Sequence, residues 1–249
     1  ADLRWKNGLL EMRLNSETPL TSEQWDAVAS LKPRAFYFNH NALRDEDMDS
    51  LVALDPLEIT LRINPLTGKG AAKFGAMPHL RRLESHHMHN ATPEATDALA
   101  QHPALEDFRT AGEFCISALR APKLKSVELA ELACTKASVE ELVAHSKIET
   151  LSLYAHRILT VDEACLASAA KIKTLKTLRL TFVELKFDGG LKHLLDLPNL
   201  TELDLFKVDV PEADLQKFKA VRPNVHVKFT ARSEEHTSEL QSPYVISYA

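Results

Sequence analysis

The sequence of 249 residues has little of what marks several large classes of protein. Its 3 cysteines are too few, and odd in number, for a disulfide framework. No uninterrupted apolar run approaches the roughly 18 residues that predict a membrane span. Lys and Arg form no basic block and the formal net charge is −5, which argues against a nucleic-acid or anionic-membrane partner. Only 6% of the residues are aromatic, yet 45% hydrophobic residues with mixed charge exclude a disordered or collagen-like chain.

Both ends of the chain depart from the pattern of a natural protein. The chain begins at Ala1, without an initiator Met or a charged segment followed by an apolar one, so we expect an N-terminal truncation. Cytoplasmic and exported locations therefore both stay open. Residues 232–249, which read RSEEHTSELQSPYVISYA, resemble the translated read-through of a common sequencing-library adapter. We expect them to form a non-native, disordered tail after a folded part of residues 1–231.

A pattern of alternating apolar residues recurs about every 24 residues. The clearest copy, Leu200-Thr201-Glu202-Leu203-Asp204-Leu205, reads L-x-x-L-x-L. We place the first position of successive copies at Leu9, Pro33, Glu58, Leu80, Leu105, Leu124, Ile148, Leu175 and Leu200. A tenth strand, around Val225 to Phe229, follows at the same interval with a register that is ambiguous by one residue.

Each copy predicts a strand, a turn and a helix. The alternation in L-x-L predicts a short strand with one buried face. Hydroxyl and carboxylate residues spaced as in capping boxes, Thr160 with Glu163 and Ser138 with Glu141, predict helix starts. Proline stands two residues before the next strand at four joints and ends the preceding helix, at Pro78, Pro103, Pro122 and Pro198. The unit that begins at Leu105 has 19 residues and little room for a helix.

These features resemble the leucine-rich repeat family of the bacterial type, from residue 9 to about residue 229. Its V-T-D-E-G-L segment is similar to Leu20-Thr21-Ser22-Glu23-Gln24-Trp25, to Leu159-Thr160-Val161-Asp162-Glu163 and to Val210-Pro211-Glu212-Ala213-Asp214-Leu215. The resemblance implies an α/β solenoid of about nine to ten units over residues 1–231, with a curved parallel sheet on its concave face and short helices on its convex face. The asparagine that commonly follows the strand by three residues stands only at Asn41 in our register. Val183, Val208, Leu132 and Met88 take the equivalent place, which predicts turns closed by apolar packing.

The third, fifth and seventh strand positions of such a solenoid line the concave sheet. In our register the fifth positions include Tyr37, Arg62 and Arg109, and the seventh include Asn64. The N-terminal half combines an aromatic ring, guanidinium groups and amides, which are enriched at recognition surfaces. The candidate partner-binding residues are Tyr37, Asn39, His40, Arg62, Asn64, Arg82, Glu84, His86, His87 and Arg109.

Other chemistry has weaker support in the sequence. His86-His87-Met88-His89 suggests a metal site, but consecutive strand residues point to opposite faces and no acidic or Cys ligand is paired with them. We expect Cys115, Cys134 and Cys165 to fill the core. Gly68-Lys69-Gly70 predicts an irregular turn, and no catalytic or nucleotide-binding motif occurs. We therefore expect no catalytic, cofactor-binding or metal-binding residues.

The sequence thus predicts a non-enzymatic, monomeric scaffold that binds an unidentified protein or peptide on its concave face, with no nucleic-acid partner and no membrane span. An alternative is the recognition or regulatory domain of a larger enzyme or cell-envelope protein whose catalytic part lies upstream of Ala1. A third hypothesis is that the chain is a purely structural spacer.

Overall fold

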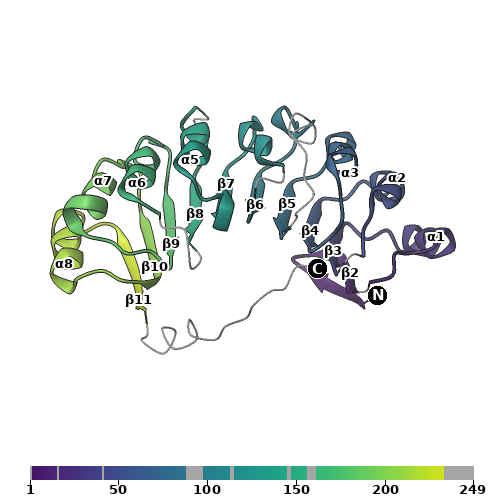
Figure 1. Cartoon of the computed structure of the whole chain (residues 1–249), viewed down its shortest axis with the longest axis horizontal. Helices are drawn as coiled ribbons and strands as arrows, with labels where there is room; N and C mark the ends of the chain where they lie inside the picture. Colours follow the sequence, from purple (N-terminus) through teal and green to yellow (C-terminus); the bar gives the residue numbers. More distant parts are fainter. Residues whose placement is uncertain are drawn as a thin grey trace, which may run out of the picture.

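The computed structural model describes residues 2–15, 17–40, 42–87, 98–112, 115–144, 147–155 and 161–232. Their strands form one eleven-stranded sheet in chain order, bent into an arch with the helices on its outer side (Figure 1). Predictions that concern Asn41, Met88, His89, Thr160 and the tail from residue 233 lie outside the described residues. The expected tail therefore stays a prediction.

Ten strands of the sheet, β2 to β11, run parallel to one another. They are β2 (Leu9–Asn15), β3 (Ala35–Asn39), β4 (Glu58–Arg62), β5 (Arg82–His86), β6 (Asp107–Thr110), β7 (Ser126–Ala130), β8 (Thr150–Tyr154), β9 (Thr177–Thr181), β10 (Glu202–Val208) and β11 (His226–Ala231). Each strand after β2 returns one repeat later beside its predecessor, as the period predicts.

Short helices cover the convex face (Figure 1). The α-helices are α1 (Ser22–Leu31), α2 (Met48–Ala53), α3 (Gly68–Ala72), α5 (Lys136–Val143), α6 (Glu163–Ala169), α7 (Lys192–Leu194) and α8 (Glu212–Val221). Tighter or wider turns are η1 (Asp45–Asp47), η2 (Lys73–Ala76), η3 (Ile116–Arg120), η4 (Glu131–Ala133) and η5 (Phe187–Leu191). None of the described helices is both long and apolar enough to cross a membrane.

The repeat pattern did not predict the first strand, β1 (Asp2–Lys6), which pairs with β2 in the antiparallel sense. Asn7 and Gly8 join the two strands with φ of 51° and 79°. Positive φ at both residues of a two-residue loop, and the Asn-Gly sequence itself, are typical of a type I′ hairpin turn. The Asn-Gly pair was the sequence signal for this strand.

The core is a stack of apolar side chains between the sheet and the helices. In β2 to β10 the fourth strand positions are at most 1% exposed; they are Met12, Phe36, Ile59, Leu83, Phe108, Val127, Leu151, Leu178 and Leu203. Two sixth positions are polar instead. Ser85 and Thr110 lie side by side on β5 and β6. The Ser85 hydroxyl donates to the Thr110 hydroxyl at 3.2 Å, and the Thr110 hydroxyl donates to the Gly112 carbonyl at 2.8 Å, so both are satisfied inside the core.

The helix starts differ from the predicted capping boxes. Helix α5 begins one turn before Ser138, because the Thr135 hydroxyl accepts from the Ser138 backbone N–H at 3.1 Å. The Asp162 carboxylate caps α6 by accepting from the Cys165 N–H at 2.8 Å. The described residues do contain a capping box at α1, where Thr21 and Gln24 bond reciprocally.

The sequence also gave predictions for two irregular units. The segment Gly68-Lys69-Gly70 was predicted to be an irregular turn, which is wrong: it begins α3, capped by the Thr67 hydroxyl that accepts from the Lys69 N–H. A Cβ on Gly70 would lie 2.1 Å from a side-chain oxygen of Asp45 in the preceding repeat, so any larger residue would displace the Asp45 side chain. The 19-residue unit has the short turn η3 where the following repeat has helix α5, which confirms its lack of room.

Inward and outward strand positions should differ sharply in their contribution to stability. Leu178 is fully buried, so Leu178→Ala should lower the free energy of unfolding by about 2–5 kcal/mol. The adjacent Arg179 faces outward, and Arg179→Ala should cost well under about 1 kcal/mol. Denaturant titration of both variants measures the difference, and equal losses would contradict the register.

Candidate functional site

The concave face consists of the strand side chains that point away from the apolar core. The fifth strand positions form a row across it: Arg13, Tyr37, Thr60, Glu84, Arg109, Glu128, Ser152, Arg179, Asp204 and Lys228. This row agrees with the predicted one except in the third repeat, and it settles the ambiguous register of the last strand by pairing Asp204 with Lys228.

The predicted register of the third repeat is wrong by two residues. Ile59 and Leu61 pair with Phe36 and Phe38, so the repeat begins at Pro56 and not at Glu58. Arg62 consequently occupies the seventh position, between Asn39 and His86, and stays on the concave face. Ile63, which we expected to point into the core, is 41% exposed.

Asn64 does not lie on the concave face. It is 4% exposed and stands three residues after Leu61, the sixth strand position, where the repeat pattern places its turn-closing asparagine. Its side-chain oxygen accepts from the Leu43 N–H at 3.0 Å, and its amide donates to the Phe38 and Arg62 carbonyls at 3.1 and 2.9 Å. The expectation that only Asn41 could hold such a place is therefore wrong.

Apolar packing replaces this asparagine in some later repeats. Val183 and Val208 are at most 1% exposed, as predicted. Leu132 is 66% exposed, so the prediction is wrong there, and Ala133 of η4 is buried next to it.

Most of the charged candidates lie together. We call seven side chains on β4 to β7 the charge network: Arg62, Arg82, Glu84, His86, Asp107, Arg109 and Glu128. Glu84 is its centre, since its carboxylate lies 3.0 Å from Arg82 Nη2, 3.1 Å from His86 Nε2 and 3.9 Å from Arg62 Nη2. Burial acts to raise the pKa of Glu84, but hydrogen bonds and positive charge from His86 and Arg82 outweigh it and lower the pKa to about 2.

The charge network continues onto the next two strands. Arg109 binds the Asp107 carboxylate through two nitrogens, at 3.1 and 3.2 Å, and lies 3.9 Å from Glu128. Burial works against the charge of Arg109, yet Asp107 and the nearby carboxylates raise the pKa of Arg109 further. Cations and carboxylates thus alternate across four strands, which holds the long side chains in fixed positions.

The remaining candidates occupy the ends of this half. The Arg13 guanidinium lies 3.9 Å from the centre of the Tyr37 ring, a cation–π contact that holds the ring on the face. Asn39 and His40 both contact the Asn15 side-chain oxygen, at 3.1 and 2.8 Å. His87 lies apart from the charge network, with its Nδ1 3.9 Å from a Glu131 oxygen.

The sequence did not predict a row of left-handed residues at the eighth position of the repeats, directly after the strands or, for Lys207, within β10. They have φ between 50° and 58°, none is glycine, and they are His40, Ile63, His87, Glu131, Phe182 and Lys207. Such a conformation costs roughly 1–2 kcal/mol for an ordinary residue. Hydrogen bonds to the next strand offset it: the N–H of His40, of Ile63 and of Phe182 each donates to a carbonyl there at 3.2 Å.

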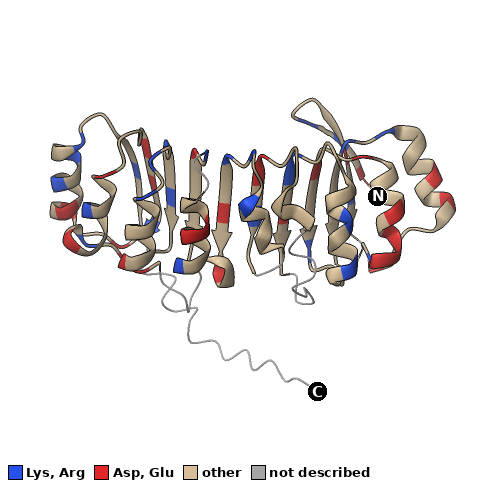
Figure 2. Cartoon of the chain, turned by 90° about the horizontal axis from the view of Figure 1, so that it is seen from above, with Lys and Arg blue, Asp and Glu red and all other residues tan. Residues whose placement is uncertain are grey.

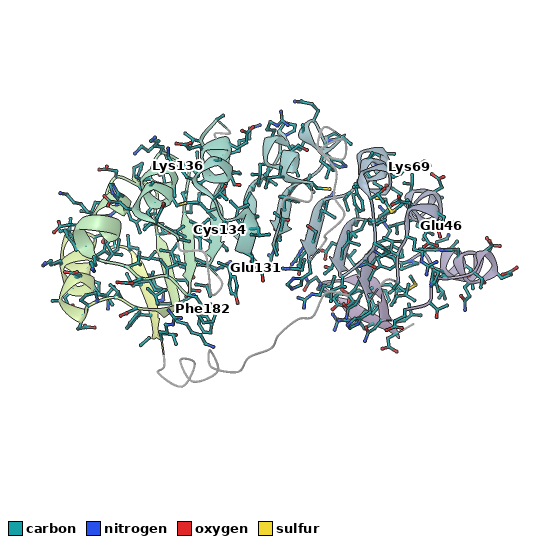
Figure 3. The ribbon with its side chains drawn as sticks, in the orientation of Figure 1. Glu46, Lys69, Glu131, Cys134, Lys136 and Phe182 are labelled. Atoms are coloured by element: carbon teal, nitrogen blue, oxygen red, sulfur yellow. The ribbon has the colours of Figure 1, made fainter. Side chains whose placement is uncertain are left out.

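One result of this backbone is an aromatic cluster at the C-terminal half, made of Tyr154, Phe182 and Phe206. The Tyr154 and Phe182 rings meet edge to face at 5.5 Å, and Lys207 lies over the Phe182 and Phe206 rings at 5.2 and 5.5 Å. Figure 3 places Phe182 and Glu131 toward the hollow of the arch and Lys136 on its outer side. Aromatic rings beside a cation are typical of interaction surfaces.

The described residues offer little for catalysis or metal binding. All three cysteines are buried and unpaired, and burial raises the pKa of each thiol, to about 12 for Cys134 and about 11 for Cys165. Within the described ranges no group of three or more His, Cys, Asp or Glu side chains could hold a metal ion.

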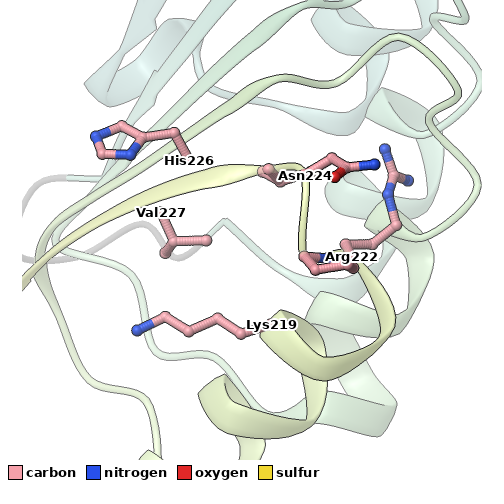
Figure 4. Close-up of a pocket in the computed structure, with 7 residues that line it drawn as sticks. Lys219, Arg222, Asn224, His226 and Val227 are labelled. Carbon is pink, nitrogen blue, oxygen red and sulfur yellow. The ribbon is translucent and has the colours of Figure 1, made fainter.

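A hollow of about 470 Å³ opens between α8 and β11 at the C-terminal end (Figure 4). Arg222, on its wall, donates to the carbonyls of Leu195, Leu197 and Leu200 and so binds the segment between α7 and β10.

The convex helices also carry charged residues, with acidic side chains on α1 and η1 (Figure 2).

The comparisons with known proteins bear on the fold. A scan against protein-family models and a search of the curated proteins find no match. An internalin, InlF, from Listeria monocytogenes strain 4b F2365 is similar in structure, with a TM-score of 0.52, 12% identity and coverage of 80% of this chain and 55% of the internalin chain. A plant peptide hormone receptor, RGFR1, solved in complex with RGF2, has a TM-score of 0.41 and 13% identity. The match covers 90% of this chain and 39% of the receptor chain.

This chain therefore spans about half the length of the internalin chain and less than half the length of the receptor chain. The parallel arch and its likeness to the internalin confirm the predicted fold class, an α/β leucine-rich repeat solenoid.

The buried position of Asn64 predicts a role in stability. Asn64→Ala leaves the buried Leu43 N–H without its acceptor and removes an amide donor from the Phe38 and Arg62 carbonyls, so the free energy of unfolding should fall by about 1–3 kcal/mol. Asn39→Ala, on the concave face, should cost less than about 1 kcal/mol. Denaturant titration compares the two variants, and an Asn64→Ala protein as stable as Asn39→Ala would refute the assignment.

The lowered pKa of Glu84 predicts a pH-dependent stabilisation. Because the folded pKa, about 2, is below the ordinary value of 4.5, the charged form stabilises the fold above pH 4.5. This stabilisation should decline as the pH falls from 4.5 toward 2. We expect the stability difference between the wild type and Glu84→Gln to shrink over that range in denaturant titrations. A difference that stays constant from pH 7 to about pH 3 would contradict the role of the charge network.

Proposed function

We propose that this chain is a non-enzymatic scaffold that binds a protein or an extended peptide on its concave face. The observation that carries the proposal is the inner side of the eleven-stranded sheet, which none of the described helices covers. These helices pack on the opposite side, so the strand side chains that point away from the core face the hollow of the arch (Figure 1). From β2 to β11, nine steps of about 4.8 Å between strands extend these side chains over roughly 43 Å, enough for a protein surface or a peptide.

The side chains of this face are held in place before any partner arrives. Arg13 holds Tyr37, and the charge network fixes Arg62, Arg82, His86 and Arg109 against neighbouring carboxylates. A partner that binds such a surface loses less side-chain entropy on association. Since positive and negative groups alternate there, we infer that the partner presents mixed polar and charged groups and not a surface of one sign.

The aromatic cluster adds a second contact region to the proposed surface. Phe206 is 45% exposed and lies on the same face as the charge network, on a strand further toward the C-terminus. Burying aromatic rings supplies most of the affinity in many interfaces. We therefore extend the proposed surface from Tyr37 to Phe206, with Asn64 removed from it.

The alternative reading, a recognition domain of a larger enzyme or cell-envelope protein, uses the same surface. The two hypotheses differ in the purpose of binding the partner and not in the surface that binds it. The experiment below tests the binding face in both cases.

Selection of peptides from a random display library against the full chain tests the face. For peptides that bind, Tyr37→Ala combined with Arg62→Ala should weaken binding by at least about tenfold, because the half-buried Tyr37 ring and the exposed Arg62 side chain both lie on the proposed surface. The melting temperature should stay unchanged.

A matched double variant on the convex side is the control. Lys136 and Glu140 form an exposed pair on α5 at 3.2 Å, and their replacement by alanine should leave peptide binding unaltered. Undiminished binding by the Tyr37 and Arg62 variant, or loss in the control, would reject the concave face.

A further inference from the structure

The N-terminal strand β1 presents an unusual outer edge. A two-residue hairpin closes on a hydrogen-bonded pair, here Lys6 and Leu9. Backbone groups of Asp2, Arg4 and Lys6 therefore point toward β2, and those of Leu3 and Trp5 point away from it. In the part of the chain that the structure describes, no strand pairs with this outer edge, since β1 is the first strand of the sheet (Figure 1).

Two large apolar side chains on β1 are exposed. Trp5 is 76% exposed and Leu3 is 47% exposed. They lie opposite Leu10 and Met12 of β2, so they share the core side of the sheet. The described helices begin only with α1, after β2, and leave these two side chains uncovered. Exposed apolar groups beside unpaired backbone groups are features of a strand that can pair with another chain.

The other side of β1 carries alternating charges. Asp2, Arg4 and Lys6 face the concave side, where Arg4 and Lys6 both form ion pairs with Glu11. Glu11 is 2% exposed, so it binds these cations firmly inside the hairpin. Burial opposes the charge of Glu11, but Arg4 and Lys6 lower the pKa of Glu11 below its ordinary value.

We propose that β1 pairs with β1 of a second copy of this chain, antiparallel, about a two-fold axis through Arg4. In this register Leu3 lies opposite Trp5 of the other copy, twice, on the core side. Asp2 lies opposite Lys6 of the other copy, twice, on the concave side. The outward backbone groups of Leu3 and Trp5 then exchange hydrogen bonds, as antiparallel pairing requires.

The other two-fold registers are worse. An axis at Trp5 sets Arg4 against Lys6 twice, whereas the axis at Arg4 makes a single like-charge pair. An axis at Leu3 pairs only Asp2, Leu3 and Arg4 of the two β1 strands with each other. A shift by one residue would set apolar side chains against charged ones across the sheet. Only the axis at Arg4 pairs all five residues. The two Arg4 side chains meet at its centre, and each is compensated by Glu11 of its own copy.

Such a dimer joins two sheets edge to edge and covers Trp5 and Leu3. Its interface involves one short strand per copy, so we expect weak association that depends on concentration. The proposal replaces the monomer that the sequence leads us to expect. It does not depend on the concave face binding a partner.

Sedimentation velocity of the full chain from about 10 μM to about 1 mM tests the proposal. The wild type should shift toward a dimer with rising concentration, and Trp5 fluorescence should shift to the blue as the ring is buried. Trp25, the other tryptophan, is already buried, with 6% of its surface exposed, and should not contribute to the shift. A wild type that stays monomeric throughout would overturn the proposal.

Charge reversal tests the register. Asp2→Lys alone and Lys6→Glu alone should each weaken self-association by about tenfold or more, because like charges then face each other. An equimolar mixture of the two variants should form a heterodimer, since the two positive side chains of the Asp2→Lys chain then lie opposite the two negative side chains of the Lys6→Glu chain. Native mass spectrometry would detect this heterodimer. Failure of the mixture to associate would refute this register.

Two further variants keep the test independent of hairpin folding. Trp5→Thr retains strand propensity and should weaken the dimer, because it removes the apolar contact. Lys228→Glu alters the opposite edge strand, β11, and should leave the dimer intact. A dimer that survives Trp5→Thr unchanged, or that is lost in Lys228→Glu, would place the interface elsewhere.

Discussion

No single repeat of this chain can bury its own apolar face, and the structure depends on this constraint. Each strand presents its fourth and sixth positions to one side, and a neighbouring repeat must cover them. Leu178 and Leu203 lie side by side on β9 and β10 and are fully buried only because the two strands are paired. Stability is therefore approximately a sum of contacts between neighbours, and the strand register places the outward side chains as well.

The same register explains the electrostatics of the concave face. Side chains two residues apart on one strand, and diagonal neighbours on adjacent strands, are close enough for ion pairs, so Glu84 meets Arg82 and His86 on its own strand and Arg62 on the strand before it. Because Glu84 is half-buried among these cations, it stays charged well below the ordinary pKa of a glutamate. The rows of polar residues are thus part of the fold as well as a surface for a partner.

The period, the strands and most of the outward rows could be predicted from the sequence, because a column of apolar residues repeats where packing demands it. The third repeat could not be placed reliably. Glu58, Leu61 and Ile63 fit L-x-x-L-x-L about as well as Pro56, Ile59 and Leu61, and a shift of two residues keeps the same side chains on the same face. Asn64 distinguishes the two registers, since a buried asparagine closing the turn belongs three residues after Leu61.

Other parts of the candidate site had no sequence signal of this kind. The left-handed residues after the strands, Phe182 among them, are not glycine, so their backbone conformation could not be recognised from residue type. The aromatic cluster depends on that conformation. The helix caps were placed a few residues off because several hydroxyl and carboxylate residues precede each helix, and only the packing of α5 decides in favour of Thr135.

The spacing of the strands has a consequence for the kind of segment this face could recognise. A peptide in the polyproline II conformation lying across the strands advances about 3.1 Å per residue and has three residues per turn, while the strands are about 4.8 Å apart. Three peptide residues therefore span about the distance between two strands, and every third side chain points the same way. Tyr37 and Glu84, two strands apart, would then contact residues i and i+3 of one such segment.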